Sequence, residues 1–386
     1  MRIFFILASP FPNYTGGRET WLYNVTRRID ASQAEIHIMV TESDEQPCAF
    51  KLDERLSLVK IRTLTATKWT RWLCRSYFRL LDYAIFVAKA ASYLKKNSTP
   101  EDIIFAMGPI IEIMPAILSV KGKRTANLVC SVRTLHAETL ARTFPIIKNI
   151  FFKLEEYSFK MSGKILCNGQ DTLKYVREMG FQAEFMPNGV DFMKFAGARD
   201  GKLNDAVRKR FLVAATIQKV KGIDELLMAC ERLNAKNLAE KYLVDWVGKG
   251  DSASYASKAR ERGLARNIVF HGVLSNTRDF YRYADCALNL SGGGGMSMAL
   301  LESMAAGCAT IAWDSPVYRQ LVVNGESAIL VKENSWEELA NAMERVITGN
   351  PDALASLGEK AQETARTYDW QNVTRILLEY CRSAIP

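Results

Sequence analysis

The stretch ALNLSGGGGMSMALLE, residues 287–302, decides the fold class of this chain. Three of its first four residues are apolar and predict a buried strand, and its last residues have helical spacing and carry Glu302. Between them stand four glycines, Gly292 to Gly295, and a second strand, ATIAW at 309–313, follows the helix. A strand, a glycine loop, a helix and a strand form a βαβ unit, whose backbone N–H groups and helix N-terminus favour an anion. A nucleotide diphosphate suits such a site.

Strands and helices alternate along the rest of the chain. The first half offers strands at 3–8, 35–40, 56–61, 103–106, 126–131, 164–168 and 183–185, with helices such as 20–30 and 171–179 between them. The second half offers strands at 211–215, 242–247 and 268–273, with helices at 222–234 and 252–262. This alternation predicts two α/β domains, each with a parallel sheet covered on both faces.

Composition and length fit a globular chain of two domains. The length of 386 residues exceeds what one hydrophobic core usually organises. With 48% hydrophobic and 24% charged residues, the composition is near the globular average and argues against disorder. A polar linker around 197–201 predicts domains at 1–195 and 196–367, followed by a last segment at 368–386. The eight cysteines and three histidines show no metal-ligand or disulfide spacing, so we expect no bound metal and a reducing, cytoplasmic location. No apolar run approaches the ~20 residues that span a bilayer.

The net charge of +9 is concentrated in one segment, 68–96, where seven basic residues face the single acid Asp82 and aromatic residues lie among them. This mixture suits a helix at a membrane interface. It equally fits a core helix with a solvated basic face. The candidates for contact with an acceptor or an anionic membrane surface are Trp69, Arg71, Trp72, Arg75 and Arg79. The aromatic residues recur at helical spacing and form no stacking platform, so we expect no nucleic-acid partner.

A series of short motifs runs through the chain in a fixed order. They are Gly16-Gly17 with Glu19, Pro187 to Asp191, Lys221 to Asp224, Val247 to Gly250, Val269 to Val273, Tyr283 to Asp285, Leu301 to Gly307 and Tyr368 to Trp370. In order and spacing the chain resembles the retaining glycosyltransferases of family 4, over nearly its whole length. The resemblance implies the GT-B fold, with two Rossmann-like domains facing across a cleft. The N-terminal domain would take the acceptor, the C-terminal domain the nucleotide sugar, and a helix at 368–386 would cross back to the N-terminal domain.

The resemblance also implies roles for single residues. Gly16 and Gly17 would let the donor diphosphate and the attacking hydroxyl approach the backbone. Lys221 would neutralise the leaving diphosphate, and Glu302 would accept hydrogen bonds from the ribose. The donor-binding set is completed by Thr216, Gly248, Val273, Gly294, Gly295 and Met296. In the N-terminal domain, His136 or Arg133 would contact substrate, and either residue suits that role.

Three positions depart from the family pattern. Gly294 stands where relatives have the first of two paired glutamates, and Thr216 stands where they have a phosphate-binding arginine, whose place Lys219 could take. Gln320 replaces another usual glutamate, next to Arg319. Two interpretations stay open: a donor sugar that is held differently, with help from Arg319, or reduced catalytic power.

The function that the resemblance implies is retaining transfer from a UDP- or GDP-sugar to a lipid-linked or polysaccharide acceptor of a bacterial envelope. The departing phosphate oxygen would take the acceptor proton, so no metal or cofactor is expected. The enzyme would lie in the cytoplasm, on the inner face of the plasma membrane if it is peripheral. The alternatives are a weakened protein that binds without transfer, a membrane-surface or nucleic-acid-binding protein that uses the fold as a scaffold, and a nucleotide-sugar epimerase.

Overall fold

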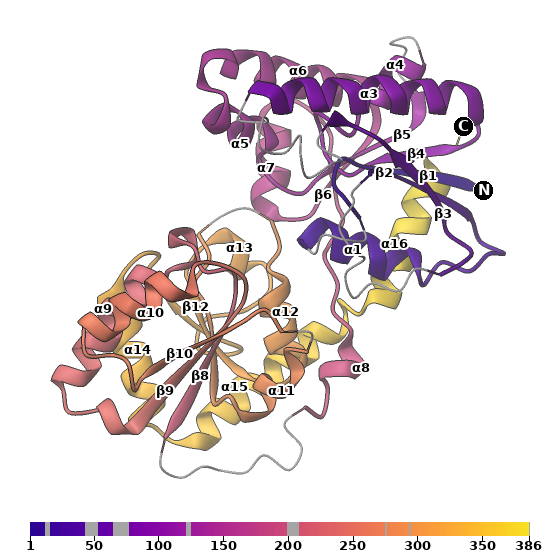
Figure 1. The fold of residues 1–386 in the computed structure, drawn as a ribbon. Coiled ribbons are helices and arrows are strands. Elements are labelled where there is room, and N and C mark those ends of the chain that lie inside the picture. The colour runs from indigo at the N-terminus through magenta and orange to yellow at the C-terminus, as the bar shows by residue number, and fades with distance from the viewer. Residues whose placement is uncertain are drawn as a thin grey trace. The chain divides into compact units, whose positions relative to one another are not determined.

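The computed structural model describes residues 1–11, 16–42, 53–64, 77–120, 125–198, 208–274, 276–292 and 295–385. The chain divides into two compact units. One consists of Met1–Asn188 together with Trp370–Pro386, and the other is the continuous segment Gly189–Asp369 (Figure 1).

The first unit is built on a parallel sheet in the order β3-β2-β1-β4-β5-β6-β7. Its strands are β1 Arg2–Leu7, β2 Glu35–Thr41, β3 Ser57–Ile61, β4 Ile103–Ala106, β5 Thr125–Val132, β6 Ser162–Cys167 and β7 Glu184–Phe185. The central strands are apolar because helices cover both of their faces. Every residue from Ile3 to Leu7 is fully buried, and so is Phe105 on β4.

Helices flank this sheet on both sides. They are α1 Gly17–Thr26, α3 Tyr77–Asn97, α4 Met114–Ser119, α5 His136–Thr143, η2 Pro145–Ile147, α6 Lys148–Met161, α7 Gln170–Glu178 and α16 Trp370–Ser383. Figure 1 shows α3 and α6 over one face of the sheet and α1 with α16 over the other. The chain thus returns at its end to the first unit, where α16 buries Trp370, Val373 and Leu377.

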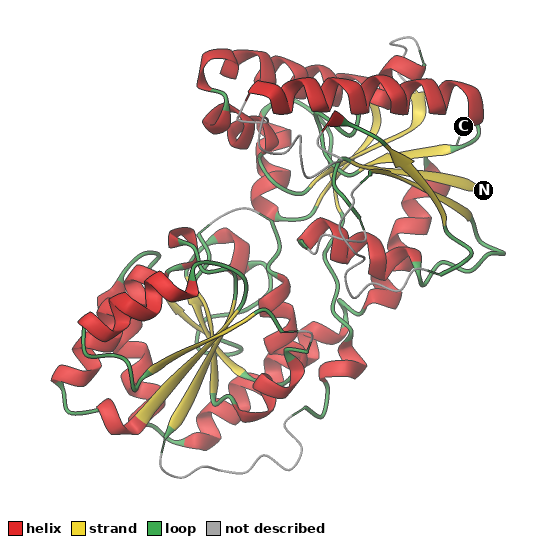
Figure 2. Cartoon of the chain, viewed as in Figure 1, coloured by secondary structure: helices red, strands yellow, loops and turns green. Residues whose placement is uncertain are grey.

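The second unit has a parallel sheet in the order β10-β9-β8-β11-β12-β13. Its strands are β8 Lys209–Ala214, β9 Tyr242–Val247, β10 Ile268–Gly272, β11 Cys286–Asn289, β12 Ala309–Trp313 and β13 Ile329–Val331. The helices are α8 Phe192–Phe195, η3 Lys219–Lys221, α9 Ile223–Ala235, η4 Ala239–Lys241, α10 Ser252–Glu261, α11 Arg278–Tyr283, α12 Met298–Ala305, α13 Pro316–Arg319, α14 Trp336–Thr348 and α15 Pro351–Arg366. Figure 2 shows this sheet with helices on both sides.

The fold class predicted from the sequence is confirmed, with two doubly wound parallel sheets and a C-terminal helix that returns to the first unit. The helix after the glycine run begins at Met298, and its cap is Ser297. The Ser297 Oγ accepts a hydrogen bond from the Leu300 N–H at 3.2 Å, which satisfies one of the free donors of the first turn. The described glycines of the run, Gly292 and Gly295, therefore precede the helix.

Candidate active site

Each sheet has one place where the strand order reverses. In the first unit it lies between β1 and β4, and in the second unit between β8 and β11. The loops that leave the two strands diverge there, and doubly wound sheets bind ligands in the crevice outside these carboxyl ends. The loops after these four strands are therefore the candidate ligand-binding loops.

In the second unit, the loops after β8 and β11 meet. The Lys221 Nζ donates to the Ser291 Oγ at 2.6 Å, and the Gly292 N–H donates to the Val220 carbonyl at 3.0 Å. Gly222 makes the approach possible, because its φ is +72° and a Cβ there would lie 2.6 Å from the Leu290 Cβ. Burial lowers the pKa of Lys221. The structure thus places a partly desolvated ammonium group beside the glycine loop.

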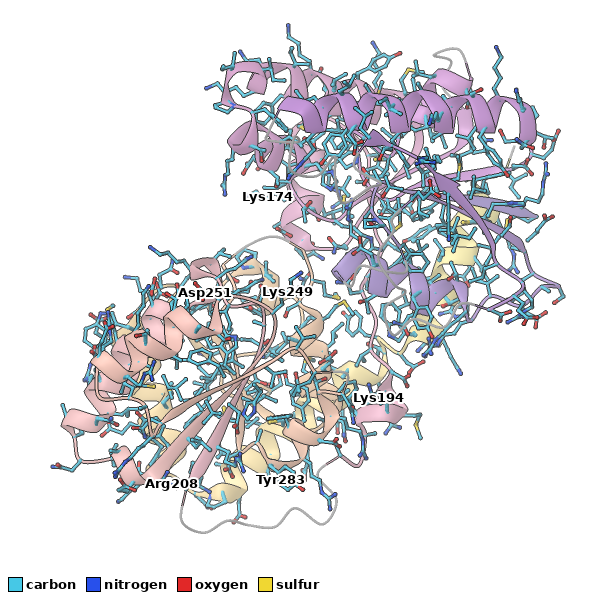
Figure 3. The ribbon with its side chains drawn as sticks, viewed as in Figure 1. Lys174, Lys194, Arg208, Lys249, Asp251 and Tyr283 are labelled. Carbon is cyan, nitrogen blue, oxygen red and sulfur yellow. The ribbon has the colours of Figure 1, made fainter. Side chains whose placement is uncertain are left out.

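Glu302 lies on α12, one turn after the cap of this helix. Its Oε2 accepts a hydrogen bond from the Thr277 hydroxyl at 3.2 Å. Burial raises the pKa of Glu302 to about 7, although Thr277, Lys194 and Tyr281 favour the ionised form. Lys194, labelled in Figure 3, belongs to α8. Hydrogen bonds from ligand hydroxyls would stabilise the carboxylate, and a ribose offers such hydroxyls.

The remaining donor-binding candidates follow successive strands of the same sheet. Thr216 is exposed after β8, and Val273 is exposed after β10. Gly248 follows β9, where a Cβ would lie 2.0 Å from the Ala215 carbonyl oxygen, so no side chain fits. Lys249 and Asp251, labelled in Figure 3, lie in the loop that begins at Gly248. These positions share the carboxyl edge of the sheet.

Three candidates belong to the glycine run of the sequence or follow it directly. Gly295 has φ +87°, a conformation that side chains rarely adopt, and Met296 is buried beside it. Gly294 lies outside the described residues. Arg319 forms an ion pair with Asp314, with Nε 2.5 Å and Nη2 2.6 Å from the two carboxylate oxygens. Arg319, which the sequence suggested as a further donor contact, is thus paired with a partly exposed carboxylate of its own unit.

In the first unit, charged side chains gather at the reversal between β1 and β4. Gly16 caps α1 and Gly17 is its first residue, with open space around the position of a Cβ. The Arg18 Nη1 donates to the Glu112 Oε1 at 2.6 Å, and Glu112 is only 1% exposed. Burial opposes ionisation of Glu112, but Arg18 and then His136 hold its pKa below the ordinary value.

His136 is the first residue of α5 and lies against the loop after β4. A Cβ added at Gly108 would lie 2.6 Å from the His136 Cε1 and 2.5 Å from the Glu112 Oε2. Burial lowers the pKa of His136 to about 4, against the opposing effect of Glu112. The imidazole is therefore neutral at neutral pH, and the histidine belongs to the same cluster as the Arg18–Glu112 pair.

Arg133 follows β5 and is held by several contacts. Its Nη1 donates to the Asn188 Oδ1 at 2.7 Å and its Nε donates to the Ser131 Oγ at 3.1 Å. Its guanidinium carbon lies 4.0 Å from the centre of the Trp21 ring. Burial lowers the pKa of Arg133 to about 9. Its Nη2 is buried without a hydrogen-bond partner among the described residues.

Sequence reasoning missed Arg18 and Glu112. Arg18 follows Gly17 directly, so a cation beside the glycine loop could have been read from the sequence. Glu112 stands in the apolar run around the start of α4, and nothing in its neighbourhood signals a partner far away in sequence.

Of the five candidates for an interfacial role, only Arg79 lies within the described residues. Trp69, Arg71, Trp72 and Arg75 lie outside the described residues, and Arg79 is exposed on α3. Within the described ranges, no helix has the length and apolar character to cross a membrane. Those ranges also contain no group of three or more His, Cys, Asp or Glu side chains that could hold a metal ion.

Comparison with known proteins gives concordant results. Residues 198–364 match the family described as Glycosyl transferases group 1. A phosphatidyl-myo-inositol mannosyltransferase of Mycolicibacterium smegmatis is 29% identical over 250 residues, which cover 63% of this chain and 62% of that protein. Sucrose-phosphate synthase from Thermosynechococcus elongatus has a similar structure, with a TM-score of 0.82, 15% identity and coverage of 99% and 98%. HepE of Anabaena, solved with UDP and glucose, gives a TM-score of 0.74 at 16% identity, with 98% of each chain covered.

Proposed function

We propose that the chain is a glycosyltransferase of the GT-B type that transfers a sugar from a UDP- or GDP-sugar to a lipid-linked or polysaccharide acceptor, with retention of configuration. The second unit would bind the donor and the first unit the acceptor. We place the reaction in the cytoplasm, in the biosynthesis of envelope glycans such as lipopolysaccharide.

The observation that carries the proposal is the Lys221–Ser291 contact of 2.6 Å at the strand reversal of the second unit. It sets an ammonium group at the glycine loop, where a leaving diphosphate accumulates charge. Glu302 on the following helix supplies the carboxylate for ribose hydroxyls. The HepE structure with UDP and glucose supports a nucleotide-sugar donor for this fold.

In the proposed reaction the acceptor oxygen bonds to the anomeric carbon as the bond to the diphosphate breaks. The departing phosphate oxygen takes the acceptor proton, so the chain positions the groups and stabilises charge, and no metal is required. Transfer that persists in excess EDTA is the expected result, and transfer abolished by EDTA and restored by a divalent ion would contradict a metal-free reaction.

A lipid-linked acceptor is supported by the name of the mannosyltransferase relative and by one surface of the first unit. Around η2 and the start of α6, Ile146 is 83% exposed and Ile150 is 52% exposed. Helix α6 carries three exposed lysines, Lys148, Lys153 and Lys160, and one exposed carboxylate, Glu156. Apolar side chains flanked by cations suit an anionic lipid surface.

The donor is tested by thermal shift with UDP, GDP and a panel of their sugars, because a ligand of the folded state raises the melting temperature. We expect stabilisation by one nucleotide family, lost in Glu302→Ala. Glu344→Ala is the matched control, since Glu344 pairs with Lys236 on the surface of the same unit. No stabilisation by any nucleotide would overturn the proposed donor.

Transfer is then measured with the identified donor and with membrane lipids or polysaccharide as acceptors. Donor binding without transfer to either acceptor would favour a catalytically weakened binding protein, the alternative that Gly294, Thr216 and the Arg319–Asp314 pair suggest.

The surface around η2 is tested by flotation with phosphatidylglycerol vesicles. Binding that salt weakens and that Ile146→Ser with Ile150→Ser abolishes would support it, and unchanged binding in this double variant would exclude it.

A further inference from the structure

Glu112 has one carboxylate oxygen whose partner is missing. Its Oε1 accepts from Arg18, but its Oε2 is buried and has no hydrogen-bond partner among the described residues. A buried ionised oxygen without a partner costs more than an ordinary lost hydrogen bond. The structure should therefore offer a donor nearby.

The neighbour of this oxygen is the imidazole of His136. The Glu112 Oε2 and the His136 Cε1 both lie within 2.6 Å of the position that a Gly108 Cβ would take, so the two atoms flank the same point. The imidazole atom that faces Gly108 is thus a carbon, Cε1. A half-turn about the Cβ–Cγ bond of His136 exchanges Cε1 with Nε2 and leaves the outline of the ring unchanged.

We propose that Glu112 is a positioning residue for His136: its Oε2 accepts a hydrogen bond from the Nε2–H of the turned imidazole, and Arg18 holds the carboxylate through Oε1. The proton is then fixed on Nε2, which leaves the lone pair of Nδ1 as an acceptor. Gly108 is required at this place because any side chain would separate the carboxylate from the ring.

The consequence for the reaction rests on the proposed function. A histidine whose tautomer is fixed presents a defined acceptor, Nδ1, to a substrate hydroxyl. Such a group orients a hydroxyl and need not remove its proton. His136 would thereby contact substrate, while Glu112 and Arg18 act through it.

The pair is tested without any substrate, because the chain has only three histidines, His37, His136 and His271. Selective ¹⁵N labelling of histidine in the full chain gives three imidazole spin systems, and their nitrogen shifts report which nitrogen carries the proton. His136→Asn assigns the signals. In the wild-type chain at pH 7.5 we expect His136 as the pure Nε2–H tautomer. A mixture of tautomers, or the Nδ1–H form, would overturn the proposal.

Glu112→Gln sharpens the test. Arg18 will attract the amide oxygen, so the amide NH₂ group will face the imidazole and favour an unprotonated Nε2. We expect the tautomer of His136 to switch to Nδ1–H, and an unchanged spectrum would refute the pairing. Asp102→Asn is the matched control, since Asp102 pairs with Arg2 at 2.6 Å between the amino ends of β1 and β4. It should leave the His136 signals in place.

Transfer measured with the same variants gives the functional part. We expect Glu112→Gln to lower kcat/KM by roughly tenfold to 100-fold, while the thermal shift with the donor nucleotide stays unchanged. An unchanged kcat/KM would contradict a positioning role even if the tautomer switches. If no donor or acceptor is found, the proposed function fails while the nuclear magnetic resonance result stands by itself.

Discussion

Glu302 is a residue whose environment favours its neutral form. Burial raises its pKa from 4.5 to about 7. Between these values the folded chain keeps a proton at Glu302 that the unfolded chain has lost, so the free energy of unfolding falls as the pH rises through this interval. Donor binding would reverse the preference, because ribose hydroxyls donate to the ionised form.

The substitution Glu302→Gln should remove this pH dependence. Relative to the wild type, the variant should gain stability as the pH rises from 5 to 8, by on the order of 2 kcal/mol. Urea denaturation of both proteins at the two pH values measures the change. A difference in unfolding free energy that is the same at pH 5 and pH 8 would show that Glu302 has an ordinary pKa.

Lys221 and Lys219 offer a comparison of two cations on the same turn. Lys221 contacts Ser291 and is partly buried, whereas Lys219 is exposed. We expect Lys221→Met to lower the rate of transfer about 100-fold or more, as loss of a charge-stabilising donor does, and Lys219→Met to have little effect. Comparable losses in the two variants would indicate that Lys219 takes the place of the arginine replaced by Thr216.

At the scale of elements, the second unit depends on the close approach of two loops at Gly222. The substitution Gly222→Ala adds a Cβ 2.6 Å from the Leu290 Cβ to a backbone with φ +72°. Gly263→Ala has a similar φ of +70° with nothing within 4 Å, so it isolates the backbone cost, which is about 1 kcal/mol. We expect Gly222→Ala to cost about 1–3 kcal/mol more in unfolding free energy and to abolish the nucleotide thermal shift. Equal costs for the two variants would show that the loops separate easily.

The sequence predicts the helices and strands better than it predicts the contacts between them. Buried parallel strands such as β1 and β4 are continuous apolar runs, so their presence and their order along the chain can be read directly. The short strand β13 is not predicted from the sequence, because a run of three apolar residues is too short to identify a strand.

The residues of the candidate site also differ in how well the sequence predicts their proximity. Lys221, Glu302 and the glycine loop stand on motifs that lie close together in sequence, so their proximity could be expected. The Arg18–Glu112 pair joins residues 94 positions apart, and only the order of β1 and β4 in the sheet brings them together. The neutral state of His136 also depends on burial, which no spacing reveals.

At the scale of the whole molecule, the two units should respond separately to core truncation. Leu377 on α16 and Leu339 on α14 are both fully buried, the former in the first unit and the latter in the second. Each leucine-to-alanine change should cost about 2–5 kcal/mol in its own unit. Hydrogen exchange followed by mass spectrometry should show Leu377→Ala weakening protection in 1–188, and Leu339→Ala in 189–369. Loss of protection spread equally over both units would mean that they unfold as one.

The return of α16 to the first unit has a consequence for biosynthesis. The segment Gly189–Asp369 is continuous, so its whole sheet and all its helices are translated before Trp370. The first unit, although translated earlier, must wait for Trp370–Ser383 before its core is complete. A released chain that stops at residue 369 would thus carry a complete second unit and an incomplete first unit, with the surface that α16 covers exposed to chaperones and proteases.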